Sequence, residues 1–174
     1  GNVINTNCEY ICSEFWGKGT WRSEGIGGNM FGEKLSHYVD LPRWWIGKPV
    51  TDVYSVSAPN VVGYYRVRDN YQTTYRFANG AVSHLTFMMA PASTFDGDPL
   101  LNTIDRQRGY GHELRYLIQG TKGAVATDTF ARTLRRWEFG ETDGQFTSKL
   151  VQTITWNADQ DYIYCHNTRD QARD

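Results

Sequence analysis

Short strand-like runs joined by tight turns fill most of the chain after residue 50, and one helical pattern precedes them. The run VTDVYSVSA (50–58) alternates and is rich in β-branched residues, which is typical of a strand. Asn79-Gly80 separates two further runs, 70–78 and 81–89, and this dipeptide favours a hairpin turn with positive φ at both central residues. Further strands are predicted at 112–120, 124–129, 133–139 and near 148–155.

The helical pattern lies just before the first of these strands. An apolar stripe recurs there at helical spacing, at Phe31, Leu35, Tyr38, Pro42 and Trp45. Pro42 cannot donate a backbone hydrogen bond and crowds the carbonyl four residues back, so we expect a kink or a break near Asp40–Leu41. Gly47 is expected to end the segment as a left-handed cap.

The remaining segments carry weaker signals. Residues 1–29 are expected to be irregular because Asn, Gly and Ser recur there, and 91–111 is expected to be a polar loop. The tail from Asp161 is expected to begin a helix that the chain does not complete, which suggests a piece of a longer protein. The predicted fold class is α+β, an open, mostly antiparallel β-sheet with helices packed on one face, and the 174 residues form one domain.

The charges nearly cancel, with 18 Lys and Arg against 19 Asp and Glu. This balance does not favour nucleic acid or an anionic membrane as a partner. No apolar run approaches the roughly 20 residues that a membrane-spanning helix needs.

Three cysteines, Cys8, Cys12 and Cys165, allow two interpretations. Cys8 and Cys12 could form a metal-binding pair if they were helical, and Cys165–His166 could complete a zinc site. We favour ordinary reduced cysteines in a cytoplasmic protein, with no metal.

Glu33, His37 and Asp40 are the best candidates for chemistry. On a helix they lie within about 60° of one another, away from the apolar stripe. Carboxylates one turn above and below an imidazole can fix its tautomer, help it to hold or pass a proton, and bind several hydroxyl groups. The alternatives are a solvated helix face and a metal-ligand pair of Glu33 and His37. The metal alternative is weakened because the other histidines are scattered over the chain, at His84, His112 and His166.

Aromatic residues near this helix are candidates for substrate contact. Trp21 and Arg22 precede the glycine-rich turn and could line a pocket. The alternative for every aromatic residue is packing in the core. The glycines of GIGGNMFG do not have the spacing of a dinucleotide-binding loop, and no strand is expected before them.

The segment GGNMFGEKLSHYVDLPRWWIGKPVTDVYSV resembles the second domain of the Gfo/Idh/MocA (glucose–fructose oxidoreductase / inositol dehydrogenase) family. The resemblance extends to DNYQTTYRFANG and HELRYLIQGTKGAVATD, and covers roughly residues 21 to 130. It implies that 1–174 is a C-terminal substrate-binding and oligomerisation domain, and that the N-terminal Rossmann domain lies outside this chain. It also implies hydride transfer between NAD(P) and a hydroxyl of a sugar or cyclitol.

The resemblance assigns roles to the helix residues. His37 matches the catalytic histidine, Glu33 stands where the family usually has aspartate, and Asp40 matches an acid that binds substrate hydroxyls in some members. Glu33 is one methylene longer than aspartate, so its carboxylate is displaced. Glu33-Lys34 is not the family's Glu-Lys-Pro motif, because Leu35 follows.

Further expectations follow from the same resemblance. The isolated chain should be inactive, because its NAD(P) would be bound mainly by the other domain. A homodimer or tetramer through the sheet face is expected, with its contact made by Tyr64, Tyr71, Tyr75 and Phe77. The alternatives are a domain of an NAD-dependent glycosidase on the same scaffold and a non-catalytic oligomerisation module.

Overall fold

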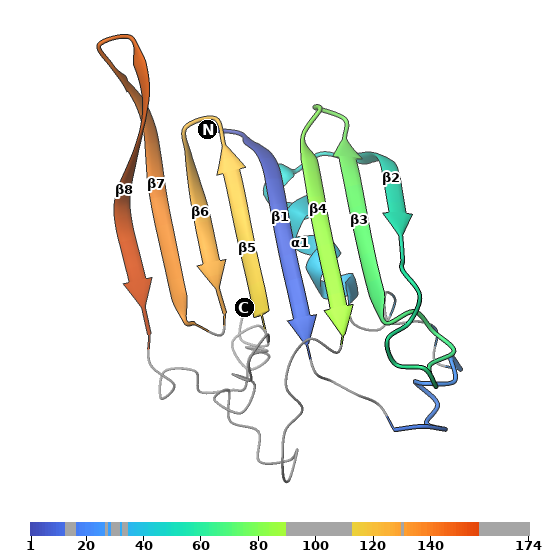
Figure 1. Ribbon diagram of the computed structural model, residues 1–174. Helices are drawn as coiled ribbons and strands as arrows, with labels where there is room; N and C mark the ends of the chain where they lie inside the picture. Colours follow the sequence, from blue (N-terminus) through green and yellow to red (C-terminus); the bar gives the residue numbers. More distant parts are fainter. Residues whose placement is uncertain are drawn as a thin grey trace, which may run out of the picture.

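The computed structural model describes residues 1–12, 17–26, 28, 32, 35–89, 113–129 and 131–156. In this part of the chain, one helix lies against an open sheet of eight strands (Figure 1). The elements are β1 (Val3–Cys12), α1 (Ser36–Ile46), β2 (Val50–Val56), β3 (Asn70–Phe77), β4 (Val82–Met89), β5 (Glu113–Gly120), β6 (Gly123–Asp128), β7 (Thr133–Thr142) and β8 (Gln145–Thr155).

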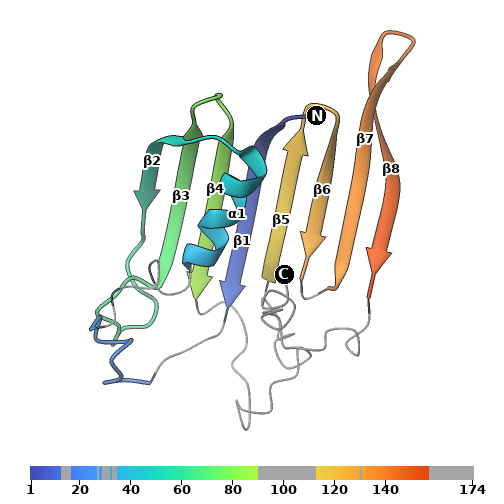
Figure 2. The same cartoon turned by 180° about the vertical axis from the view of Figure 1, so that it is seen from behind.

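The strands lie in the order β2-β3-β4-β1-β5-β6-β7-β8, so β2 and β8 form the two edges. β1 and β4 run parallel, and every other neighbouring pair is antiparallel. The sheet is therefore open and mixed, and the expectation of a mostly antiparallel sheet holds outside this central pair. Several helices were expected on one face, but α1 is the only helix in the described residues (Figure 2). We call the face opposite α1 the open face.

The expectation that residues 1–29 are irregular is wrong for β1, which lies in the middle of the sheet. β1 alternates between a buried side, at Thr6, Cys8, Tyr10 and Cys12, and a more exposed side. Its backbone is paired with β4 on one edge and β5 on the other, so its amides are satisfied without strongly apolar side chains. Two of these four buried residues are cysteines and one is threonine. The alternation of apolar and polar residues that marks a strand is therefore hard to see in the sequence.

The hairpin predicted at 70–78 and 81–89 is confirmed as β3 and β4, but its turn differs. The Gly80 amide donates to the Phe77 carbonyl at 2.8 Å, and Gly80 has a φ of 82°, which Asn79 does not share. This arrangement is a type I turn followed by one left-handed residue. The turn with two positive φ values lies instead between β7 and β8, at Asp143 (52°) and Gly144 (74°).

The strands predicted near β2, β5 and β6 are confirmed. β7 and β8 are longer than predicted, because only Asp143 and Gly144 form the turn between them. The expected loop at 91–111 and the expected helix after Asp161 lie outside the described residues. No helix in the described ranges is long and apolar enough to span a membrane.

We expected a kink or a break near Asp40–Leu41, and the break is wrong, because α1 runs without interruption across Pro42. Pro42 and Ile46 are buried, and Tyr38, Leu41 and Trp45 pack against the main core. Helices in proteins are stabilised largely by such packing, which outweighs the one lost hydrogen bond. Gly47 ends the helix as predicted, with a φ of 63° and its amide bonded to the Arg43 carbonyl at 2.9 Å.

The core lies between α1 and the central strands. It includes Leu35, Tyr10, Phe87 and Met89, and a polar pair is buried beside it, with the Thr6 hydroxyl donating to Ser83 Oγ at 2.7 Å. Tyr71 and Tyr75 pack against this side of the sheet, and Phe77 is 2% exposed. The expectation that these three residues form a subunit interface is therefore wrong, because alternate positions of β3 point toward α1. Tyr64 lies before β3 and packs edge-on against Tyr65.

Candidate functional site

The side of α1 that faces away from the sheet carries His37 and Asp40, and both are exposed. Leu35, Pro42 and Ile46 are buried on the opposite side. Their three-residue spacing places His37 and Asp40 about 60° apart around the helix axis. The structure therefore brings two of the three predicted helix residues onto one accessible stripe. Glu33 lies outside the described residues.

Local contacts orient this stripe without blocking it. Asp40 Oδ1 accepts from Arg43 Nη1 at 3.4 Å, and the two side chains are 72% and 64% exposed. Such an exposed ion pair stabilises the helix by only a few tenths of a kcal/mol. Another hydrogen-bond donor could therefore replace Arg43 at Asp40 at a cost of about half a kcal/mol. The His37 ring lies edge-on to Tyr38 at 6.5 Å, and Tyr38 in turn packs on Tyr10 at 4.7 Å. Within the described residues His37 makes no hydrogen bond or ion pair, so its ring nitrogens can reach an external partner.

Trp21 and Arg22 lie on a separate turn at residues 17–26. The Arg22 guanidinium stacks over the Trp21 ring at 4.3 Å from its centroid, and Trp21 remains 48% exposed. A cation over an indole face is held by the ring quadrupole. The exposed indole and the guanidinium give this turn a flat surface with a positive charge beside it.

Polar contacts order this turn internally, and a backbone hydrogen bond and an ion pair join it to the segment between β2 and β3. The Ser23 hydroxyl is buried and contacts the carbonyls of Gly17 and Thr20 at 3.1 and 3.0 Å. The Arg66 amide donates to the Ser23 carbonyl at 2.9 Å, and its guanidinium pairs with Glu24 at 2.8 Å. The position of Trp21 and Arg22 therefore depends on residues 58–69.

Asp69 organises that segment. Its side chain is fully buried, and Oδ2 accepts the amides of Val61 and Val62 at 2.9 and 2.8 Å. Its Oδ1 accepts from Asn70 Nδ2 at 2.9 Å. A buried carboxylate is tolerated because each of its oxygens is hydrogen-bonded. Sequence reasoning missed this residue, which carried no signal beyond an Asp just before a predicted strand.

Trp44 is a further residue that sequence reasoning missed. It is 77% exposed and lies seven residues after His37, so it shares the outward stripe of α1. The sequence signal was this seven-residue spacing, which places Trp44 on the outward side of the helix and the adjacent Trp45 on the inward side. Trp45 packs inward, edge-on to Tyr116 at 5.2 Å.

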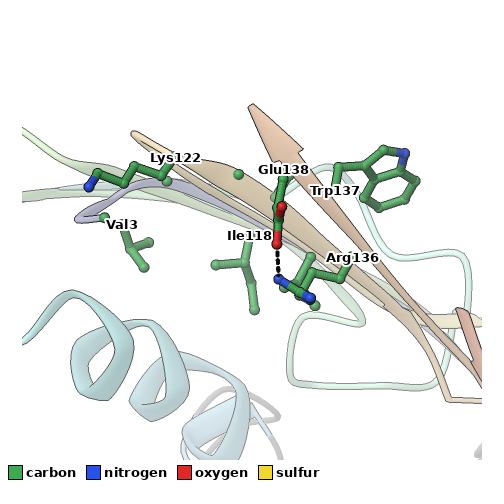
Figure 3. A pocket seen from close by; sticks show the side chains of 11 residues that line it. Val3, Ile118, Lys122, Arg136, Trp137 and Glu138 are labelled. Atoms are coloured by element: carbon green, nitrogen blue, oxygen red, sulfur yellow. Dashed lines mark hydrogen bonds and ion pairs between the residues drawn. The ribbon is translucent and has the colours of Figure 1, made fainter. Parts of the chain in front are cut away.

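Two hollows lie elsewhere on the sheet. One, of about 250 Å³, is lined on the α1 side by Val3, Ile118 and the ion pair of Arg136 with Glu138, which join at 2.7 Å (Figure 3). The other, of about 530 Å³, lies on the open face. None of His37, Asp40, Trp21 and Arg22 lines either hollow.

The cysteines do not form the helical pair that a metal site would have needed. Cys8 and Cys12 are free thiols on the buried side of β1, and a strand places residues four apart at about 13 Å. Burial raises the pKa of the Cys8 thiol to about 12, so this group is protonated at neutral pH. Cys165 lies outside the described residues.

The described part of the chain also offers no dinucleotide cradle. Such a cradle needs a strand, a glycine-rich turn and a helix that crosses to an adjacent parallel strand. The single parallel pair, β1 and β4, is separated in sequence by α1, β2 and β3. The residues present therefore do not fit NAD(P) in this way.

Similar proteins were found at the levels of family and structure. Residues 1–126 match the model of the GFO/IDH/MocA C-terminal domain. A search of curated proteins gave no match.

Among solved structures, levoglucosan dehydrogenase in complex with NADH and L-sorbose is 18% identical, with a TM-score of 0.60 over 87% of this chain and 39% of that chain. The WlbA dehydrogenase from Bordetella pertussis, in complex with NADH and UDP-GlcNAcA, is 23% identical, with a TM-score of 0.61 over 82% of this chain and 37% of that chain. UDP-N-acetylglucosamine 3-dehydrogenase GnnA from Acidithiobacillus ferrooxidans is 14% identical, with a TM-score of 0.59 over 98% and 46%.

These likenesses agree on the fold, and this chain spans less than half the length of each of these three proteins. The family match covers well over half of the chain and includes both β1 and the helix that carries His37. The chain therefore belongs to the GFO/IDH/MocA C-terminal domain family.

Proposed function

We propose that this chain is the substrate-binding domain of a longer NAD(P)-dependent oxidoreductase that acts on a hydroxyl of a sugar or cyclitol. The observation that carries the proposal is the outward stripe of α1, where His37 and Asp40 are exposed on a helix fixed to the sheet. The family membership supports the reaction class. The sugar-type ligands in the levoglucosan dehydrogenase and WlbA structures support the substrate class.

The chemistry requires that a hydroxyl lose its proton as the carbon it is attached to loses a hydride. A nicotinamide cofactor supplies the hydride acceptor in such a reaction, and it would be held by a part of the protein outside this chain. His37 would accept the hydroxyl proton, since an imidazole changes its charge near neutral pH and these ring nitrogens are open. The bond that forms is the carbonyl of the product, and the proton passes from His37 to solvent.

The other predicted residues would position the substrate. Asp40 would accept hydrogen bonds from neighbouring hydroxyls, because its exposed pair with Arg43 is readily replaced. Glu33 is proposed as the second acid beside His37. Trp21 and Arg22 would stack on and bind the far side of the sugar.

Replacement of His37 in the full-length protein tests this proposal. His37→Ala should lower kcat by about 10² to 10⁴, the usual contribution of a general base, while cofactor affinity stays unchanged. His84→Ala is a matched control, because His84 is also exposed but lies on β4 and contacts Thr74 at 3.0 Å. Unchanged turnover in His37→Ala would support a non-catalytic module instead.

Two further measurements separate the remaining alternatives. Purified 1–174 should not reduce NAD(P) with any polyol, and measurable reduction would contradict the assignment of the cofactor to another domain. Product analysis with a glycoside would reveal cleavage if the full-length protein were an NAD-dependent glycosidase.

We also propose that the chain self-associates as a homodimer or tetramer. The open face supports this, because no described element covers it and it exposes apolar residues such as Leu117, which is 49% exposed. Light scattering on the purified chain is the direct check, and a monomer at high concentration would contradict it.

A further inference from the structure

The outward stripe of α1 continues beyond His37 and Asp40 to a large aromatic side chain. Trp44 lies seven residues after His37 and four after Asp40, and it is 77% exposed. These spacings place Trp44 about 20° from His37 and about 40° from Asp40 around the helix axis. None of the described segments lies over this side of α1 (Figure 2). The three residues therefore form one continuous accessible stripe.

The rise of the helix sets the length of this stripe. The Cα atom of Trp44 lies about 10 Å beyond that of His37 along the axis, and about 6 Å beyond that of Asp40. A six-membered ring is about as wide as one helical turn is high. A sugar or cyclitol ring that meets both His37 and Asp40 therefore leaves the next turn, with Trp44, to another part of the ligand.

Core packing does not account for Trp44. The adjacent Trp45 points inward and lies edge-on to Tyr116 at 5.2 Å, so it belongs to the packing of α1 on the sheet. Trp44 points the other way, and tryptophan side chains are on average well buried. A flat indole that is left open beside two candidate substrate-binding residues is suited to a ligand.

The surroundings of Trp44 have the chemistry that holds a ring with hydroxyl groups. A long side chain on a helix leans toward the helix N-terminus, so the indole covers the turn that carries Asp40. Asp40 Oδ1 accepts from Arg43 Nη1 at 3.4 Å, and both side chains are exposed. The indole offers an apolar face to a ring, while the carboxylate and the guanidinium beside it can accept from and donate to hydroxyl groups at the ring edge.

We propose that Trp44 forms a second subsite, which stacks on a ring joined to the sugar that reacts at His37. The substrate class is then a glycoside, in which one sugar carries the reacting hydroxyl and a second ring lies on the indole. This inference rests on the proposed function, because that function places the reacting ring at His37 and Asp40. Trp44 touches no reacting atom, so it controls selectivity rather than proton transfer.

Binding to the full-length protein tests the subsite without turnover. The probes are the hexose or pentose that the protein oxidises fastest, free and as its phenyl β-glycoside, chosen from a panel that contains both forms of each sugar. Isothermal titration with the reduced cofactor present measures both dissociation constants, because no hydride acceptor is then available. Wild-type protein should bind the phenyl glycoside about tenfold more tightly, which is the order of one aromatic stacking contact.

Variants assign this preference to the indole. Trp44→Ser should remove the preference and change the dissociation constant of the free sugar by less than about twofold. Trp44→Phe keeps a flat ring and should retain most of the preference. Tyr54→Ser is the matched control, because Tyr54 is 70% exposed but lies on β2, and it should leave the preference unchanged. Circular dichroism confirms that each variant is folded.

The outcomes separate this inference from the proposed function. His37→Ala should lose turnover but keep the binding preference. No preference in the wild type, or a Trp44→Ser variant that keeps it or weakens both ligands equally, would overturn the second subsite and leave the role of His37 in place. Normal turnover in His37→Ala, or a panel without turnover, would overturn the proposed function and the inference with it.

Discussion

Asp69 fixes the segment on which the Trp21–Arg22 turn rests, so its removal should destabilise the fold and loosen that turn. Its carboxylate accepts two backbone amides, from Val61 and Val62, at 2.9 and 2.8 Å. A buried hydrogen bond to a charged group contributes about 1.5–3 kcal/mol, so Asp69→Ala should lower the free energy of unfolding by roughly 3–5 kcal/mol. For a domain of this size that corresponds to a fall of roughly 10 °C in Tm.

Urea unfolding followed by tryptophan fluorescence is the assay. Asp69→Asn is the matched variant, because its one carbonyl oxygen can still accept from the backbone, and it should lose about half as much stability. A loss below about 1 kcal/mol in Asp69→Ala would refute the view that this carboxylate holds the segment together. A large loss in Asp69→Ala with an unchanged Trp21 environment would refute the link to the turn.

Two other predictions concern the sheet. Gly123→Ala should lower the free energy of unfolding by several kcal/mol, as in an overpacked core, because the added Cβ would collide with the Trp137 carbonyl. Gly63→Ala is the control, because a Cβ at Gly63 would face open space. Equal thermal midpoints for the two variants would contradict this reasoning. Cys8 and Tyr75 should contribute a constant stability below about pH 9, and this contribution should be lost toward pH 12. Burial raises the pKa values of both groups to about 12, and in the unfolded chain the thiol, with its ordinary pKa of 9.0, loses its proton first. Cys8→Ala should reduce this alkaline slope in urea titrations, and an unchanged slope would exclude Cys8 as a cause.

The hairpins could be predicted from the sequence because their signals are local. The Asn79-Gly80 and Asp143-Gly144 dipeptides mark turns whatever surrounds them, although only the second has positive φ at both residues. At Asn79-Gly80, the hydrogen bond from the Gly80 amide to the Phe77 carbonyl belongs to a type I turn followed by one left-handed residue. Which of the two turn types forms depends on the register of the strands rather than on the dipeptide.

β1 could not be recognised in the same way. Its position between β4 and β5 is a long-range property, and its buried residues Thr6, Cys8 and Cys12 are small or weakly apolar. The continuity of α1 across Pro42 has the same origin, because packing on the sheet outweighs a local preference. Helical spacing placed His37 and Asp40 on one exposed face of this helix, whereas the end of β7 was predicted too early and the start of β8 too late.

The account depends on the outward stripe of α1 facing the substrate in the full-length protein. A crystal structure of that protein with a nicotinamide cofactor and a bound polyol measures this directly. We predict a His37 ring nitrogen within about 2.6–3.2 Å of the reacting hydroxyl oxygen, or joined to it through one water. A His37 ring that faces bulk solvent or another subunit, with the polyol bound elsewhere, would contradict the proposed function.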